Sequence, residues 1–412
     1  MTLAWHPHAL FIVLFLLFGL ITVLVNSHTV RRFDQYPTAK RTPRVSVLVP
    51  ARNEERNIEA CIISLLEQNY PDFEIIVLDD HSTDNTFSIL DRLAGKDSHL
   101  QILEGRPLPA GWLGKHWACH QLDLAATGEL ILFVDADTRH SPDMLLDSVS
   151  ALLAEGADLV TAFPREEVVT WGESLLVPVI GFGIFTFIPI RLVQKLRLAA
   201  LSVTIGQFML FRREAYDAVG GYEAVRIEIV DDMVLGRRII SAGLEWRLLD
   251  GTRHITCRMY RSFWEAVGGF SKSIFAVFDY RILPYFLGWL LVGMAFIEPV
   301  VAFVSRWMRT PLTSMPVEYA ATSVVLSIIL WMIAYRRFKF PAHLVFLPST
   351  QPGAFSRGSY LLVLSDSDRY SDVERTPVGP GCHALVVGND KLCPYDIMGE
   401  DEDTGYQTGF AR

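Results

Sequence analysis

The sequence predicts an α/β domain with a largely parallel sheet, placed between hydrophobic segments that are long enough to cross a membrane. Over residues 44–257, short apolar runs alternate with segments of helical periodicity, which is the pattern of parallel strands covered by helices. Three long stretches with almost no charge flank this region. A mean hydropathy of +0.27 is high for a soluble enzyme, yet 20% charged residues are too many for a chain that lies entirely in lipid.

The first hydrophobic stretch, residues 9–25, reads ALFIVLFLLFGLITVLV and contains no charge. Its length is close to the minimum for a membrane span, which needs about 20 apolar residues. A cleaved signal peptide is the alternative, but no Lys or Arg precedes the stretch, and a basic cluster follows it within 31–44. We therefore predict an uncleaved anchor within residues 1–30, with the next domain on the cytoplasmic side.

Three apolar runs predict strands of the domain that we place at 44–257. They are residues 45–49, 74–78 and 130–134, and a helix is expected over 56–69 between the first two. Each run is followed closely by polar or acidic groups. Ligands of open α/β sheets bind beyond the carboxyl ends of the parallel strands, so these groups are expected to share one crevice. They are Asn53 and Glu54, Asp79 and Asp80, and Asp135 and Asp137.

The turn VDAD at 134–137 holds two carboxylates two residues apart, directly after a buried strand. Such oxygens can bind a divalent cation or a ribose hydroxyl, and they favour Mg²⁺ or Mn²⁺ over zinc. The five cysteines show neither a CxxC spacing nor a His pattern for zinc. Acidic turns are also common as solvated loops, but the position after the strand favours a metal site at Asp135 and Asp137.

Asp79 and Asp80 end the second strand and precede the segment HSTDNT, in which one side chain can cap the next helix. Capping of a helix accounts for only one acid in this stretch, so the others need another explanation. A carboxylate at a strand end can accept the N–H of a uracil or the hydroxyls of its ribose. We therefore predict that Asp79 and Asp80 recognise a nucleotide, and a polar turn without a ligand is the alternative.

Lys115 lies in the glycine-flanked segment GWLGKHW, where the backbone can approach a diphosphate and a cation can neutralise it. Later in the domain, Asp231 and Asp232 precede an amphipathic helix. Acids in a first helical turn are favoured by the helix dipole, which is a sufficient structural reason for them. Transfer of a group to a hydroxyl also needs a general base, and we assign that role to Asp232.

Five motifs follow one another in the domain. They are PARNEE at 50–55, LDDHSTDNT at 78–86, GWLGKHWA at 111–118, VDAD at 134–137 and VDDMVLGRR at 230–238. In order and spacing they resemble a membrane-anchored family 2 glycosyltransferase with a GT-A fold, closest to hopanoid- and carotenoid-associated bacterial enzymes. The resemblance covers roughly residues 44–340.

The resemblance implies inversion at the anomeric carbon of a nucleotide-diphosphate sugar, expected to be a UDP-sugar, with Mn²⁺ or Mg²⁺ as cofactor. It implies that Asp79 or Asp80 contacts the base, that Asp135 and Asp137 serve the ribose and the metal, and that Asp232 deprotonates the acceptor. The remaining substrate-binding residues expected within these motifs are Pro50, Arg52, Glu54, Lys115 and Asp231.

The QxxRW element of processive polysaccharide synthases is absent, which argues for transfer of one sugar per acceptor. The nearest match, RMYRSFW at 258–264, lies in a segment that we place at the membrane interface, 258–281. Arg258 and Arg261 are expected to support the diphosphate, and Trp264 the acceptor. A basic, aromatic segment before a span is also typical of interfacial anchoring.

The remaining hydrophobic stretches concern the membrane. Residues 175–190 contain two Pro and two Gly, and they predict interfacial or re-entrant elements. Spans are predicted over 282–304 and 319–335, within a region that we place at 282–340. The tail 349–412 is acidic and has little periodicity, so we expect it to be poorly ordered.

We therefore expect a multi-pass protein of a bacterial-type cytoplasmic membrane that transfers a single sugar to a membrane lipid such as a carotenoid or hopanoid. The lipid bilayer, a nucleotide sugar and the lipid acceptor are the expected partners, and no nucleic acid is expected. A processive polysaccharide synthase and a polyprenyl-phosphate or ceramide glycosyltransferase are the alternatives. A non-catalytic scaffold is disfavoured because none of the acidic sites has been lost.

Overall fold

The computed structural model describes residues 6–278, 281–340, 376–377, 383–387 and 390–392. The chain divides into two compact units, Met1–Leu362 and Val363–Arg412. In the second unit, β11 (Thr376–Pro377), β12 (His383–Val387) and β13 (Asp390–Leu392) pair as antiparallel neighbours. The rest of the acidic tail that was predicted over 349–412 lies outside the described residues.

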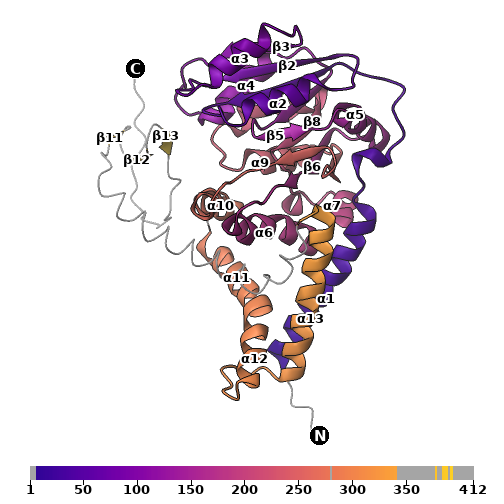
Figure 1. Ribbon diagram of the computed structural model, residues 1–412, viewed down its shortest axis with the longest axis vertical. Helices are drawn as coiled ribbons and strands as arrows, with labels where there is room; N and C mark the ends of the chain where they lie inside the picture. The colour runs from indigo at the N-terminus through magenta and orange to yellow at the C-terminus, as the bar shows by residue number, and fades with distance from the viewer. Residues whose placement is uncertain (1–5, 279–280, 341–375, 378–382, 388–389, 393–412) are drawn as a thin grey trace, which may run out of the picture. The chain divides into compact units, whose positions relative to one another are not determined.

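A seven-stranded sheet in the order β3-β2-β1-β4-β8-β6-β9 forms the centre of the first unit (Figure 1). All pairs in it are parallel except those made by β8, which runs antiparallel to both of its neighbours. This sheet confirms the predicted α/β class. Its strands are β1 (Val45–Ala51), β2 (Phe73–Asp79), β3 (Leu100–Glu104), β4 (Leu130–Val134), β6 (Leu159–Phe163), β8 (Phe208–Arg212) and β9 (Trp246–Asp250).

Helices cover both faces of the sheet, which explains why its central strands are apolar at nearly every position. Successive side chains of a strand point to opposite faces. Leu48 and Ile76 therefore join the core on the side of α4 and α9, whereas Val47 and Ile75 pack on the side of α2 and α5. The helices of the domain are α2 (Ile58–Leu66), α3 (Thr86–Ala94), α4 (Gly114–Ala125), α5 (Met144–Glu155), α8 (Arg213–Ala218) and α9 (Asp231–Ser241). Short 3₁₀ turns lie at Phe33–Gln35, Ala199–Leu201 and Gly221–Val225.

A second, three-stranded sheet lies beside the turn that follows β4. Its central strand, β10 (Ile255–Cys257), pairs antiparallel with β5 (Thr138–His140) and parallel with β7 (Arg165–Glu166). The register sets Cys257 opposite Thr138 on one side and opposite Glu166 on the other. This small sheet therefore brings the chain after 137 next to two segments that are distant in sequence.

Among the described residues, three helices are long and apolar enough to be candidate membrane spans, one amino-terminal and two carboxyl-terminal, as the sequence predicted. They are α1 (Pro7–Thr29), the continuous Ile282–Trp307 and α13 (Val317–Phe338), and they extend away from the sheet (Figure 1). The second consists of α11 (Ile282–Val292), a π turn (Gly293–Ile297) and α12 (Glu298–Trp307). Pro299 lacks an N–H to donate within the helix, which accounts for the local irregularity.

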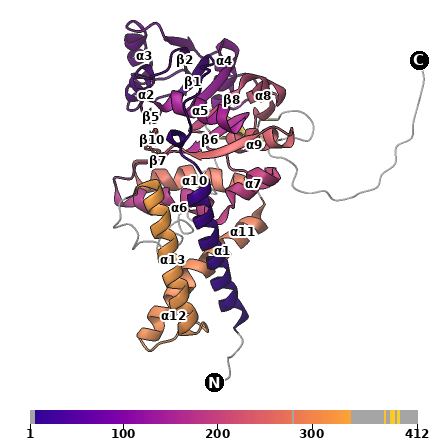
Figure 2. The same cartoon turned by 90° about the vertical axis from the view of Figure 1, so that its right-hand side faces the viewer.

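Helices α6 (Trp171–Phe187), α7 (Ile190–Leu196) and α10 (Phe263–Val277) form a layer between the sheet and the long helices (Figure 2). The α6–α7 pair bends by 58°, as a broken span or a re-entrant loop would. Pro189 lies at the bend, and the buried Asn26 of α1 donates its amide to the carbonyl oxygens of Phe185 and Ile188, each at 2.8 Å. This geometry agrees with the interfacial or re-entrant elements predicted over 175–190.

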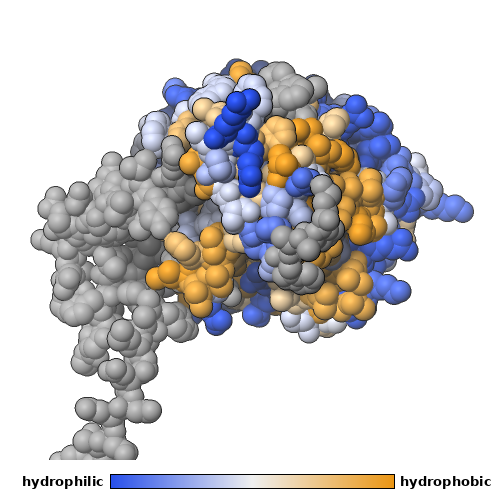
Figure 3. Space-filling model, turned by 90° about the horizontal axis from the view of Figure 1, so that it is seen from below, coloured by the Kyte–Doolittle hydropathy of each residue, from blue (hydrophilic) through white to orange (hydrophobic). Residues whose placement is uncertain are grey.

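The sheet and the long helices share one continuous core. The Phe163 ring of β6 lies 5.2 Å from that of Phe338 in α13, between ring centroids, and Phe185 of α6 contacts both. Seen from the end of the long helices, hydrophobic surface faces the viewer and hydrophilic side chains gather mainly toward the periphery (Figure 3). The α/β domain and the apolar helices are therefore packed against each other within one unit.

Candidate active site

The acidic groups that follow the strands lie at the carboxyl edge of the sheet, as expected. Ala51 of β1 stands opposite Asp79 of β2, and the Asp80 N–H donates to the Ala51 carbonyl oxygen at 2.8 Å. The turn after β4 starts near them, because β4 runs parallel to β1 and pairs with its first four residues. Pro50 stands opposite Leu78 in the same register, and its ring forms part of the strand end and not of a loop.

Asp79 and Asp80 have different surroundings. Asp79 is buried; its Oδ2 accepts from the Ser82 N–H at 3.2 Å, and its Oδ1 has no hydrogen-bond partner. Asp80 Oδ2 lies 3.4 Å from Arg52 Nη1, and a Cβ at Gly105 or Gly114 would come within 3.5 Å of the Asp80 carboxylate. A buried oxygen without a donor is rare in folded proteins, so Asp79 is available to accept from a ligand.

The loop after β2, in which a side chain was expected to cap the next helix, also ties two segments together. Asp84 accepts from the Thr86 N–H at 2.9 Å through Oδ1 and from the Glu55 N–H at 3.1 Å through Oδ2. The Glu54 N–H donates to Thr86 Oγ1 at 2.8 Å. These bonds fix the PARNEE loop against the loop after β2, so Glu54 is held at the edge of the site.

Lys115, at the start of α4, forms an ion pair with Asp135, and Nζ lies 2.7 Å from Oδ1. Although burial lowers it, the charges of Asp135 and Asp231 raise the pKa of Lys115 well above its ordinary value. One cation is therefore influenced both by the turn that holds Asp135 and Asp137, called the DxD turn below, and by the acidic pair at the start of α9. The sequence placed Asp135 in the predicted crevice, and the structure sets Lys115 against it, within electrostatic reach of Asp231.

Asp137 has little to compensate for the burial of its carboxylate. Its Oδ1 is buried and has no hydrogen-bond partner. Burial, together with the charges of Asp135 and Glu54, raises the pKa of Asp137 to about 7. Burial, with the charges of Asp135 and Asp84, also raises the pKa of Glu54.

A divalent cation fits this environment, because it would neutralise carboxylates that now repel one another. Asp135 and Asp137 supply hard oxygen ligands of the kind that Mg²⁺ and Mn²⁺ prefer. Among the described residues, no set of three or more His, Cys, Asp and Glu side chains already stands in the arrangement of a metal site. The fit therefore rests on charge and donor type at Asp135 and Asp137.

The two acids at the start of α9 are differentiated by their contacts. Asp231 Oδ1 lies 3.6 Å from His116 Nε2, and Asp231 is buried. Burial acts against it, but His116 and Lys115 hold the pKa of Asp231 below its ordinary value. Asp232 accepts from the Gly206 N–H at 3.0 Å and from the Met233 N–H at 2.7 Å.

Burial and the neighbouring Asp231 charge nevertheless raise the pKa of Asp232 to about 7. Two adjacent carboxylates with separated pKa values can divide their roles, because one stays ionised while the other can take up a proton near neutral pH. This division agrees with the base assignment for Asp232.

Sequence reasoning missed a polar cluster behind Asp137. Glu166 Oε1 accepts from Gln207 Nε2 at 2.9 Å, and Gln207 Nε2 also lies 3.3 Å from Cys257 Sγ. Burial raises the pKa of Glu166 to about 8, and the charges of Asp137 and Asp135 act in the same direction. Glu166 Oε2 is buried without a partner. The two-residue strand β7 gives no periodic signal, so only its pairing with β10 reveals this cluster.

The segment after β10 supplies two arginines. Arg258 Nη2 lies 2.9 Å from Glu173 Oε1, and the Glu173 side chain is 0% exposed. Arg261 Nη2 donates to Asn57 Oδ1 at 2.8 Å. Trp264 is 65% exposed at the start of α10, and it lines neither of the two cavities described below. The structure thus brings Arg258 and Arg261 to the site and leaves Trp264 on the surface.

A cleft of about 310 Å³ joins these parts. Its lining includes Glu54, Asn57, Asp137, Arg258, Arg261 and Glu265. The Asp137 carboxylate and the guanidinium groups of Arg258 and Arg261 therefore line the same space, where an anionic ligand with a bound cation can be held.

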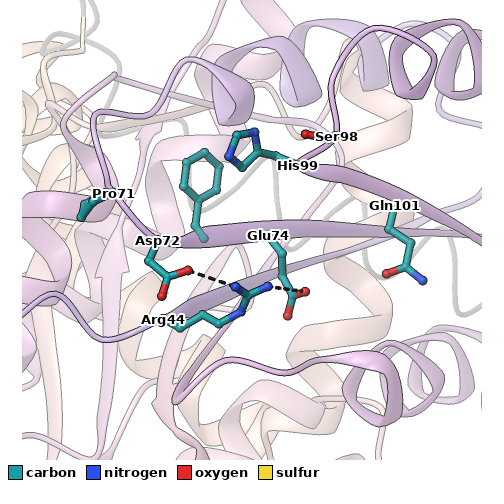
Figure 4. A pocket seen from close by; sticks show the side chains of 8 residues that line it. Arg44, Pro71, Asp72, Glu74, Ser98, His99 and Gln101 are labelled. Carbon is teal, nitrogen blue, oxygen red and sulfur yellow. Dashed lines mark hydrogen bonds and ion pairs between the residues drawn. The ribbon is translucent and has the colours of Figure 1, made fainter.

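A second hollow, of about 260 Å³, lies at the opposite edge of the sheet (Figure 4). There, Arg44 reaches Asp72 Oδ1 at 3.0 Å and Glu74 Oε2 at 3.2 Å. It surrounds the amino ends of β2 and β3, whereas ligands of parallel sheets bind at the carboxyl ends. Arg44 is already paired with two carboxylates, so we assign no function to this hollow.

Comparison with known proteins agrees with this geometry. Residues 46–220 match the family described as Glycosyl transferase family 2. The matched range contains the first four of the five motifs, and the fifth, at 230–238, lies beyond it. The resemblance predicted from the motifs is confirmed by this match.

Two curated relatives are similar to part of this chain. The 4,4'-diaponeurosporenoate glycosyltransferase of Staphylococcus haemolyticus (strain JCSC1435) is 23% identical over 260 residues, which cover 61% of this chain and 66% of that protein. The beta-monoglucosyldiacylglycerol synthase of Nostoc sp. (strain PCC 7120 / SAG 25.82 / UTEX 2576) is 31% identical over 205 residues, which cover 48% of this chain and 41% of that protein. The chain thus spans less than two thirds of the length of these relatives.

Solved structures include similar chains at low identity. The mannosyltransferase PcManGT from Pyrobaculum calidifontis, in complex with GDP-Man and Mn²⁺, has a TM-score of 0.46 at 17% identity and covers 89% of this chain and 99% of that chain. Glucosyl-3-phosphoglycerate synthase from Mycobacterium tuberculosis, in complex with Mn²⁺, UDP and glucosyl-3-phosphoglycerate, has a TM-score of 0.38 at 22% identity. It covers 57% of this chain and 80% of that chain.

Proposed function

We propose that this chain, whose residues 46–220 form a family 2 glycosyl transferase domain, transfers a single sugar from a nucleotide-diphosphate sugar to a membrane lipid. The observation that carries the proposal is the position of Lys115. It pairs with Asp135 of the DxD turn and is within electrostatic reach of Asp231, beside the proposed base. The proposed diphosphate clamp therefore contacts the proposed cation-binding turn, and it is close enough to Asp231 to be influenced by that acid's charge.

The donor is held from two sides in this proposal. Asp79, with its unpartnered oxygen, accepts a hydrogen bond from the nucleotide base, and Arg52 and Asp80 lie beside it. Lys115, Arg258 and Arg261 neutralise the diphosphate. A UDP-sugar suits an acceptor carboxylate at Asp79, because the uracil imide offers an N–H donor.

Asp135 and Asp137 would hold a Mg²⁺ or Mn²⁺ ion. When it is bound, the ion supplies positive charge that stabilises the leaving diphosphate. The unpartnered Oδ1 of Asp137 and its raised pKa support this role, since a nearby cation would favour the ionised carboxylate.

Asp232 acts as the general base. The acceptor hydroxyl gives its proton to the Asp232 carboxylate while the acceptor oxygen forms a bond to the anomeric carbon. The bond from that carbon to the diphosphate oxygen breaks with the electron pair leaving on the diphosphate. A single displacement of this kind inverts the anomeric configuration. A pKa near 7 matches the requirement for a base that works near neutral pH.

A lipid acceptor is favoured by the layer of α6, α7 and α10, which lies between the sheet and the three candidate spans. A carotenoid or a hopanoid with a hydroxyl or carboxyl end is the class we propose, and two curated relatives are named for a carotenoid acid and a diacylglycerol lipid. The protein would lie in a bacterial cytoplasmic membrane, with its domain on the cytoplasmic side.

The experiment uses membranes that contain the full chain, radiolabelled UDP-glucose or GDP-mannose, and either Mn²⁺, Mg²⁺ or EDTA. We expect a radioactive lipid that carries one sugar, formed with UDP-glucose and lost with EDTA. Radioactivity in a polymer, and not in a lipid with one sugar, would favour a processive synthase. Radioactive product formed from GDP-mannose alone would reassign the donor. Absence of any transfer and of any nucleotide binding would refute the proposal.

A further inference from the structure

Five cations gather where the domain meets the ends of two candidate spans. Arg32 follows α1, Arg337 and Lys339 end α13, Arg253 lies in the turn between β9 and β10, and Arg165 belongs to β7. We call these residues the juxtamembrane cation cluster. None of them lines the cleft that contains Asp137.

Two carboxylates hold three of these arginines in place. Asp34 pairs with Arg32 through Oδ1 at 3.0 Å and with Arg253 through Oδ2 at 2.6 Å. Asp250 is 2% exposed and pairs with Arg337 through Oδ2 at 2.8 Å. The Asp250 N–H also donates to the Arg31 carbonyl oxygen at 2.9 Å, which ties the chain after α1 to the end of β9.

Lys339 and Arg165 complete the cluster without a carboxylate of their own. Within the described part of the chain neither forms an ion pair, and both are exposed. Burial and the charges of Arg253 and Arg165 lower the pKa of Lys339, and they outweigh the opposing charge of Asp250. Five cations therefore share two carboxylates, and a positive potential remains at the surface.

Arg165 is directed away from the candidate active site. It precedes Glu166 in β7, and successive side chains of a strand point to opposite sides. Glu166 contacts Gln207 beside Asp137, so Arg165 faces the other way, toward Lys339. The cluster is thus a separate surface and not an extension of the donor cleft.

We propose that the juxtamembrane cation cluster binds a phosphate group, and that the source is the headgroup of an anionic phospholipid. Guanidinium and ammonium groups are the protein groups that bind phosphate oxygens. The cluster lies at the end of α1 and α13, where lipid headgroups meet a span of this length. Lys339 and Arg165 supply the positive charges that are not paired with a carboxylate among the described residues. The arginines paired with Asp34 and Asp250 are held in position beside them.

The test measures binding without sugar transfer, so it is independent of the proposed function. The full chain in a neutral detergent is titrated with dioctanoyl-phosphatidylglycerol, dioctanoyl-phosphatidylcholine or inorganic phosphate, and the midpoint of thermal unfolding is recorded. We expect phosphatidylglycerol alone to raise the midpoint. The double variant Lys339→Ala/Arg165→Ala should need at least about fivefold more of this lipid for the same rise.

The matched control is Lys40→Ala/Lys96→Ala, which removes two exposed lysines outside the cluster and should titrate as the unmodified chain does. Both variants are first compared without lipid, where equal midpoints show that the fold is kept. An equal lipid response of the two double variants would overturn the assignment of the cluster. A rise with inorganic phosphate at similar concentrations would overturn the lipid as its source.

Discussion

Lys115 Nζ lies 2.7 Å from Asp135 Oδ1, and this contact connects the start of α4 to the turn after β4. The charges of Asp135 and Asp231 both favour the protonated amine. Lys115 therefore stays cationic across the physiological pH range, which is what a partner of a diphosphate requires.

Replacing Lys115 with Met should lower kcat/KM for sugar transfer by roughly 10- to 100-fold, because a charge-assisted contact contributes about 1.5–3 kcal/mol. The measurement is a donor titration of the lipid product. Lys96→Met, at an exposed site on the far side of the domain, is the matched control. Full activity of the Lys115 variant would contradict its role at the diphosphate.

Replacing Asp232 with Asn should reduce transfer by about 100-fold or more, the usual contribution of a general base. The amide keeps one acceptor for the N–H groups of Gly206 and Met233, so the local fold should persist. Donor binding, measured by calorimetry, should change little. The exposed Asp91→Asn serves as control. A variant at Asp232 that transfers normally would refute the base assignment.

The pH profile should fall on the acid side with a midpoint near 7. The base acts as a carboxylate, and burial with the Asp231 charge raises the pKa of Asp232 to about 7, so protonation below that pH removes it. Asp137 titrates in the same range and in the same direction. Raising the Mn²⁺ concentration should restore only the part of the activity that is lost through protonation of Asp137, because Asp137 is the proposed metal ligand. A profile that is flat from pH 6 to 8 at every Mn²⁺ concentration would contradict both assignments.

Replacing Glu166 with Gln should stabilise the protein at alkaline pH. Burial raises the pKa of Glu166 from 4.5 to about 8, so the folded state holds a proton that the unfolded state lacks between these values. Its contribution to stability is therefore lost as pH rises through this window, by at most about 1.4 kcal/mol per pH unit. Gln stays neutral throughout. The midpoint of thermal unfolding should differ less between pH 5 and pH 8.5 for the variant than for the unmodified chain. An equal difference in the two proteins would contradict the raised pKa of Glu166.

The sequence was sufficient for the features that depend on local patterns. Apolar runs ending in acids located β1, β2 and β4, and uncharged stretches located the three candidate spans. The acids converge because parallel strands end at one edge, which topology alone guarantees.

Contacts between distant segments had no such signal. Glu166 reaches the surroundings of Asp137 only because β7 pairs with β10, and β7 has just two residues. Arg258 was predicted as a diphosphate ligand, but its partner Glu173 lies 85 residues earlier in a helix that the sequence marked as apolar. Trp264 was predicted from an aromatic motif, and its exposure depends on the packing of α10.

The partly buried ion pair between Glu173 and Arg258 leads to the last prediction. Glu173 Oε1 accepts from Arg258 Nη2 at 2.9 Å, and Oε2 accepts from the Val169 N–H at 2.7 Å, so the carboxylate joins the start of α6 to the segment after β10. Replacing Glu173 with Gln leaves the guanidinium without its counter-charge. Removing one partner of a fully buried pair typically costs about 3–5 kcal/mol, and the 26% exposure of the Arg258 side chain places the expected cost below that range. The exposed pair Arg139–Glu167 offers the control, because Glu167→Gln should change stability by less than about 1 kcal/mol. Both variants are compared by thermal unfolding and by the KM for the donor. If Arg258 is positioned by Glu173, the Glu173 variant raises the KM as well as losing stability, whereas a loss of stability with an unchanged KM would assign the pair to packing alone.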